Sequence, residues 1–80
     1  MSELTKTRQA THGGFSETAR VSQAIKQALE TGPNWHCVTR TEREALAMIA
    51  AKLARIVCGD PHFIDHWNDI AGYADLASSE

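Results

Sequence analysis

The features of disulfide-rich, membrane-spanning and exported proteins are scarce in this sequence. It holds two cysteines in 80 residues, too few for a disulfide scaffold, so we expect two reduced thiols. No apolar run approaches the roughly 20 residues of a membrane span, and the first nine residues lack a signal-peptide core. We therefore expect no membrane partner and, by default, a cytoplasmic protein.

The positive and negative charges nearly balance. The formal net charge is -2, which gives no general attraction to nucleic acid or to an anionic membrane. The sequence contains no Walker loop, nucleophile elbow, CxxC pair or HExxH motif, so P-loop enzymes, nucleophilic hydrolases and zinc proteases lack support. Eighty residues allow one domain, and the core of such a short chain is marginal.

What is present is helical periodicity. No stretch shows the alternation of a half-buried strand. A first helix is predicted from 17 to 31, with Ser16 as its N-cap, and Gly32-Pro33 should end it. Its inward face should consist of Val21, Ile25, Ala28 and Leu29.

Two further helices follow. The second should begin near Thr41, because Thr41 and Glu44 match a capping box, and Gly59 should close it. Asp60 should cap the third, with Pro61 at its first helical position and its end near Ala77. The second helix carries a broad apolar stripe of Ala45, Leu46, Ile49, Leu53, Ile56 and Val57.

These elements predict an all-α fold built from a three-helix unit, with a flexible tail over 1–14 and one helical domain over 15–77. Three short helices with stripes this broad bury little surface by themselves. We therefore expect a homo-oligomer that completes a larger helical bundle. The candidate seam residues are Leu46, Leu53, Ile64 and Ala71.

The third helix carries an ionisable stripe. At about 100° per residue, an arc of roughly 100° holds His62, Asp65, His66, Asp69 and Tyr73. Asp65 and Asp69 stand four apart and meet on one face. They could share Mg²⁺ or Mn²⁺ through oxygen ligands. Alternatively, they could face water or pair with basic groups, and the sequence leaves both interpretations open.

The second helix supplies complementary groups on one side, namely Glu44, Lys52 and Arg55. If it packs antiparallel to the third, Glu44 could approach the two aspartates and complete a metal site. Lys52 and Arg55 could then bind a phosphate. They could equally form ion pairs with Asp65 and Asp69. The sequence assigns no catalytic residue.

Three motifs carry a family resemblance across about residues 7–76. They are HGGF, EALAMIAAKLARIVCGDP and DHWNDIAGYADL. Together they resemble a family of small phage and prophage proteins of unknown function, which is distantly similar to the MazG-type all-α pyrophosphohydrolases. That resemblance implies an oligomeric helical bundle whose helix-borne acidic residues hold Mg²⁺. It also implies cleavage of nucleoside triphosphates to monophosphate and pyrophosphate.

Under this resemblance, Glu44 takes the place of an acidic residue on the second MazG helix, and Asp65 and Asp69 take those on the next. MazG enzymes carry an ExxE cluster and an ExxD pair, so three of four acidic positions are matched. The predicted function is nucleotide binding with Mg²⁺, with or without hydrolysis. The alternative is a non-catalytic helical interaction protein of phage origin. Convergence of the three acids favours the first, and direct pairing of Lys52 and Arg55 with the aspartates favours the second.

Overall fold

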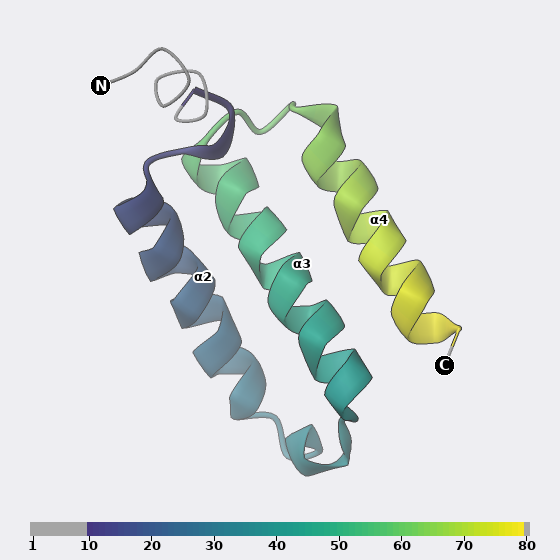
Figure 1. Ribbon diagram of the computed structural model, residues 1–80. Coiled ribbons are helices and arrows are strands. Elements are labelled where there is room, and N and C mark those ends of the chain that lie inside the picture. Colours follow the sequence, from purple (N-terminus) through teal and green to yellow (C-terminus); the bar gives the residue numbers. More distant parts are fainter. Residues whose placement is uncertain (1–9, 80) are drawn as a thin grey trace.

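Over residues 10–79 the fold consists of three long α-helices, one short 3-10 helix and a helical turn at 10–12 (Figure 1). The computed structural model describes residues 10–79, and no strand occurs within that range, which confirms the all-α prediction. Residues 1–9 of the predicted tail lie outside the described residues. The helices are α2 (Phe15–Glu30), η1 (Trp35–Cys37), α3 (Arg40–Cys58) and α4 (Ile64–Ser78).

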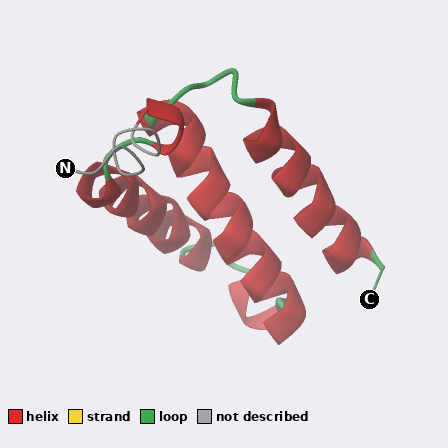
Figure 2. Cartoon of the chain, turned by 45° about the horizontal axis from the view of Figure 1, so that its top comes forward, coloured by secondary structure: helices red, strands yellow, loops and turns green. Residues whose placement is uncertain are grey.

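Helix α3 is the centre of the molecule. Helices α2 and α4 each pack against α3 and lie on its two sides (Figures 1 and 2). Both connections are short, so successive helices run antiparallel. The three helices therefore form a single layer, in which α3 is covered at its edges and two broad faces remain.

The core of this layer is thin and made mostly of alanine. Among the described residues, the buried hydrophobic side chains are Ala45, Ala50, Ala54 and Ile56. Small side chains let neighbouring helices approach closely, but they remove little apolar area from water. The inward face predicted for the first helix was partly wrong, because Ala28 and Leu29 are exposed and Ser22 is the buried residue of α2.

The start of α3 corrects the predicted capping box. Thr39 is the N-cap, its hydroxyl accepts from the Glu42 amide at 3.1 Å, and Glu42 accepts from the Thr39 amide at 2.9 Å. The sequence offers two overlapping T-x-x-E patterns, and the structure uses the earlier one. The physical reason is the connector. The guanidinium of Arg43 donates to backbone carbonyls of η1 and its C-cap, which fixes the chain just before Thr39.

The other two helix starts also differ from prediction. Helix α2 begins directly after Gly14, with no side-chain cap, so Ser16 lies inside the helix. Helix α4 begins at Ile64, because Asp60 caps a turn instead of a helix. Its carboxylate accepts from the His62 amide at 2.9 Å, and its carbonyl accepts from the Phe63 amide at 3.2 Å.

The segment before α2 is held against the junction of α3 and α4. The carbonyl of Thr11 accepts two hydrogen bonds of 3.1 Å, one from the Asp60 amide and one from the ring of His66. Gly13 has a φ of 82° and lies against Cys58, a combination that suits glycine because it lacks a Cβ. These contacts join the described start of the chain to the α3–α4 loop.

Within residues 10–79, none of the helices combines the length and apolar character required to cross a bilayer.

Candidate functional site

The antiparallel packing of α3 and α4 brings the five predicted site residues onto one face of the layer. Helical spacing places Glu44, Lys52 and Arg55 on one side of α3, and Asp65 and Asp69 on the adjoining side of α4. We call this the polar face. It comprises Arg40, Glu44, Met48, Lys52, Arg55, Asp65, Asp69 and Tyr73.

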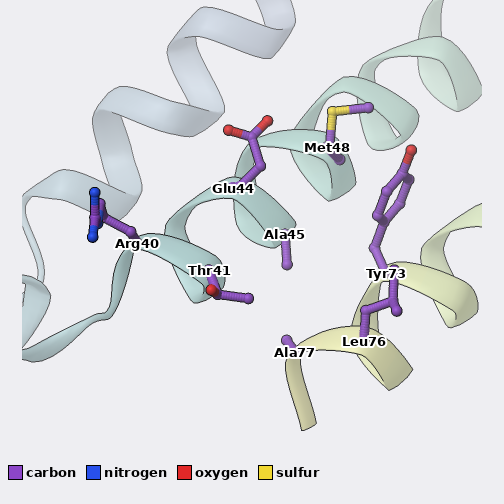
Figure 3. Close-up of a pocket in the computed structure, with 8 residues that line it drawn as sticks. All are labelled: Arg40, Thr41, Glu44, Ala45, Met48, Tyr73, Leu76 and Ala77. Carbon is purple, nitrogen blue, oxygen red and sulfur yellow. The ribbon is translucent and has the colours of Figure 1, made fainter. Parts of the chain in front are cut away.

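At one end of the polar face, α3 and α4 border a groove of about 530 Å³. Figure 3 shows Glu44, Met48 and Tyr73 extending to the same side of the two helices, whereas Arg40 stands at the start of α3 on the side away from Tyr73. The floor includes small apolar groups such as Ala45 and Ala77. This groove therefore combines a carboxylate, a guanidinium, a phenol ring and a thioether.

About two turns along α3, the polar face carries an ion pair. Lys52 Nζ lies 3.0 Å from Asp69 Oδ2, and the exposed fractions of their side chains are 12% and 47%. The Lys52 charge is thus largely withdrawn from water, whereas Asp69 keeps half of its exposure. This contact is one of the pairings expected if the basic and acidic stripes interlock.

The structure does not gather the three predicted metal ligands. Glu44 borders the groove with Tyr73, and Tyr73 stands one helical turn, roughly 6 Å of rise, beyond Asp69. Asp65 is exposed one further turn away. Over the described residues, no three acidic, histidine or cysteine side chains are grouped as metal ligands. The single chain does not bring Glu44, Asp65 and Asp69 together, so a metal held by all three remains a prediction.

The two predicted phosphate ligands have different surroundings. Lys52 is engaged with Asp69. Arg55 is half-buried on the same face, one turn nearer the end of α3. Both point to the side of the layer that carries the groove, so they could extend an anion-binding surface along α3.

His66 is the residue that sequence reasoning placed least well. It belongs to the ionisable arc of α4, yet it is 1% exposed and is the largest fully buried side chain among the described residues. Its ring meets those of His12 and Phe63 edge-on, with centroids 4.6 and 4.9 Å apart. Because a carbonyl can only accept, Nε2 carries the proton that is donated to Thr11.

Sequence reasoning also missed two parts of the groove. Tyr73 was recognised as a member of the ionisable arc, four residues after Asp69, but it was not assigned to a site. Arg40 lay before the predicted start of the second helix, so no helical face could be assigned to it. Helix α3 begins at Arg40, one residue before Thr41, and this places Arg40 at the end of the polar face.

A scan of protein-family models matches residues 2–79 to a domain of unknown function, DUF6378. The chain belongs to the DUF6378 family. The match spans nearly the whole sequence and agrees with an uncharacterised family, but it carries no statement about MazG enzymes or phage proteins. No curated protein and no solved structure matched the chain.

Proposed function

We propose that this DUF6378 chain binds a nucleoside phosphate, together with Mg²⁺ or Mn²⁺, in the groove of the polar face. The observation that carries the proposal is the lining of this groove by Arg40, Glu44, Met48 and Tyr73. Its volume of about 530 Å³ falls in the range of small-molecule sites, roughly 300–1,000 Å³. The four side chains supply groups for the phosphates, the base and the metal.

Each group has a distinct task. The Arg40 guanidinium matches phosphate oxygens with a two-pronged set of donors. The ring of Tyr73 and the thioether of Met48 offer apolar contact to a base. Lys52 and Arg55 lie 12 and 15 residues beyond Arg40, about 18 and 22 Å along α3, so they would bind an anion separate from the phosphates at Arg40.

Glu44 suits a metal that arrives with the nucleotide. Mg²⁺ keeps several waters and is commonly bound through one or two carboxylates plus substrate phosphates. A single glutamate in the groove therefore satisfies the protein's share, without a cluster of three acids. The metal would neutralise charge on the phosphoryl oxygens. The resemblance to MazG-type enzymes extends the proposal to release of pyrophosphate from a triphosphate.

The test uses thermal unfolding with Mn²⁺ or Mg²⁺ and a panel of nucleoside triphosphates. A ligand at about a hundred times its Kd stabilises by roughly 2.7 kcal/mol, which raises the midpoint by on the order of 10 °C in a chain of this size. Glu44→Gln should remove the metal-dependent part of this rise. It keeps side-chain length and helix propensity but loses the ligand charge.

The matched control is Glu17→Gln. Glu17 lies in the first turn of α2, far from the groove, and pairs only locally with Arg20. It should keep the full response. Pyrophosphate release should follow the same order of variants. If neither metal nor any common triphosphate changes the midpoint, the proposal fails; release that survives Glu44→Gln would indicate a contaminating enzyme.

A second candidate function is a non-catalytic helical interaction protein. The observation that favours it is the direct contact of Lys52 with Asp69. That contact occupies one predicted metal ligand and one predicted phosphate ligand with each other. In this case the polar stripes of α3 and α4 serve to lock the two helices together.

Asp69→Asn tests whether the contact between Lys52 and Asp69 is structural. If the ion pair is structural, this change lowers the free energy of unfolding by about 1 kcal/mol, because the mostly buried Lys52 charge loses its partner. Asp65→Asn, at an exposed position on the same helix, is the control and should change stability by less than about 0.5 kcal/mol. Urea titrations followed by circular dichroism give both values. An Asp69→Asn protein that is more stable than wild type, and that no longer responds to Mn²⁺, would instead indicate relieved repulsion at a metal site.

A further inference from the structure

The side of the layer opposite the polar face is apolar and uncovered. Helical spacing places one row from each helix on it. A groove of about 470 Å³ between α3 and α4 opens on this side; its lining is mostly apolar, with Leu46, Ile49 and Ala74, and includes Glu42 at one end. We call this surface the apolar face. It comprises Val21, Ile25, Ala28, Leu46, Ile49, Leu53, Val57, Trp67, Ile70, Ala71 and Ala74.

None of these eleven side chains is buried in the single chain. Three of the larger ones are exposed, with exposed fractions of 37% for Leu53, 71% for Val57 and 50% for Trp67, and Ile25, Leu46, Ile49 and Ile70 are half-buried. The buried core beneath them is mostly alanine. Contiguous apolar surface of this kind on a small chain marks an association site.

We infer that the apolar face binds the same face of a second copy of this chain. Size is the first argument. Helix α3 has 19 residues, about 28 Å at 1.5 Å per residue, and three helices spaced roughly 9 Å apart span about 27 Å. With the shorter flanking helices, the face covers on the order of 700 Å². A standard interface takes about 800 Å² from each partner.

The width and the apolar character of the face favour a second copy of this chain over other binding partners. A single helix is about 10 Å across and would cover only a strip of this face. Residues 1–9 bring just two large apolar side chains, Met1 and Leu4, too few to cover three helices. A second layer has the same width and the same apolar rows, so a two-fold pairing would bury both faces at once.

One charged side chain borders this surface. The eleven residues of the apolar face include no ionisable group, but Glu42, at the start of α3, lines the same groove as Leu46 and Ile49, and its carboxylate accepts a hydrogen bond from the Thr39 amide. In a two-fold pairing centred on the middle of α3, Glu42 lies at the rim of the interface, where water still reaches it. The polar face points away on both sides of the resulting assembly, so ligand binding there and self-association are independent.

The predicted seam is refined by this placement. Leu46, Leu53 and Ala71 belong to the apolar face. Ile64 stands seven residues before Ala71, so it lies on the same side of α4 and extends the apolar face at the start of that helix. Leu76 is 64% exposed, close to the 71% of Val57, but it lines the groove of the polar face, which makes Val57 and Leu76 a matched pair for an experiment.

The test measures the mass of the full chain by sedimentation from micromolar to millimolar concentration. Wild type should reach twice the monomer mass. Val57→Lys should shift the protein to monomer mass at the same concentration, because pairing would bury the ammonium. Leu76→Lys, at a similarly exposed position on the opposite face, makes the same change of charge and should retain the wild-type mass. Circular dichroism checks that both variants keep their helix content.

A second measurement needs no charged variant. Trp67 lies on the apolar face, so its fluorescence emission should shift to shorter wavelength as concentration rises, and Trp67→Phe should remove that shift while leaving the emission of Trp35. A wild-type chain that stays monomeric at millimolar concentration overturns the inference and assigns the face to a different protein. Loss of association in both lysine variants, or in neither, also overturns it.

Discussion

Replacing His66 with alanine should lower the free energy of unfolding by about 3 kcal/mol. The imidazole is 1% exposed, so its removal leaves a cavity that the surrounding backbone cannot fill. The change also deletes the hydrogen bond to Thr11 and the edge-on contacts with His12 and Phe63. Small domains have only about 5–15 kcal/mol of stability in total, so a large part of the native state's margin is lost.

Urea denaturation followed by circular dichroism measures this loss. His62→Ala is the control, because His62 is exposed and its removal should cost less than about 0.5 kcal/mol. His66→Phe keeps a ring in the same space and removes the hydrogen bond, so its loss should be limited to about 1 kcal/mol. Equal stability of the His66→Ala and His62→Ala proteins would show that the ring cluster does not hold the start of the chain.

Replacing Gly59 with alanine should destabilise the protein by a similar amount, about 3 kcal/mol. A Cβ at this position would lie 2.4 Å from the carbonyl oxygen of Thr11 and 2.7 Å from the amide nitrogen of Gly13. Both contacts are with backbone, which cannot move aside as a flexible side chain can. Relief requires the segment before α2 to shift, and that shift breaks the Asp60–Thr11 hydrogen bond.

Gly72→Ala provides a control of opposite sign. Gly72 lies within α4, and a Cβ there meets nothing within 4 Å. Alanine at a helix-interior position is favoured over glycine by about 1 kcal/mol. Thermal melts should therefore show a lower midpoint for Gly59→Ala and a higher one for Gly72→Ala. A Gly59→Ala protein as stable as wild type would mean that Thr11 does not pack on the α3–α4 loop.

The helices themselves were accessible from the sequence. Apolar residues at helical spacing and the stops at Gly32-Pro33 and Gly59 depend on local backbone chemistry, which a single sequence contains. The same spacing also put Glu44, Lys52 and Arg55 on one side of their helix, and antiparallel packing then brought them to the face that holds Asp65 and Asp69. Helical spacing does not determine which residues of two paired helices lie at the same height along their axes. Glu44 therefore lines a groove with Tyr73 and does not lie beside the two aspartates.

Tertiary contacts decided the remaining details. Two T-x-x-E patterns are equivalent in sequence, and only the contacts of Arg43 with the connector select Thr39 over Thr41. Periodicity alone predicts the same exposure for every residue in the ionisable arc of α4. In the structure, α3 and the segment around Thr11 cover only the side of this arc that faces α3. His66 is buried there, while Asp65 stays in water. Periodicity defines the faces of a helix, whereas neighbouring chain segments, distant in sequence, determine which of those faces lose their solvent.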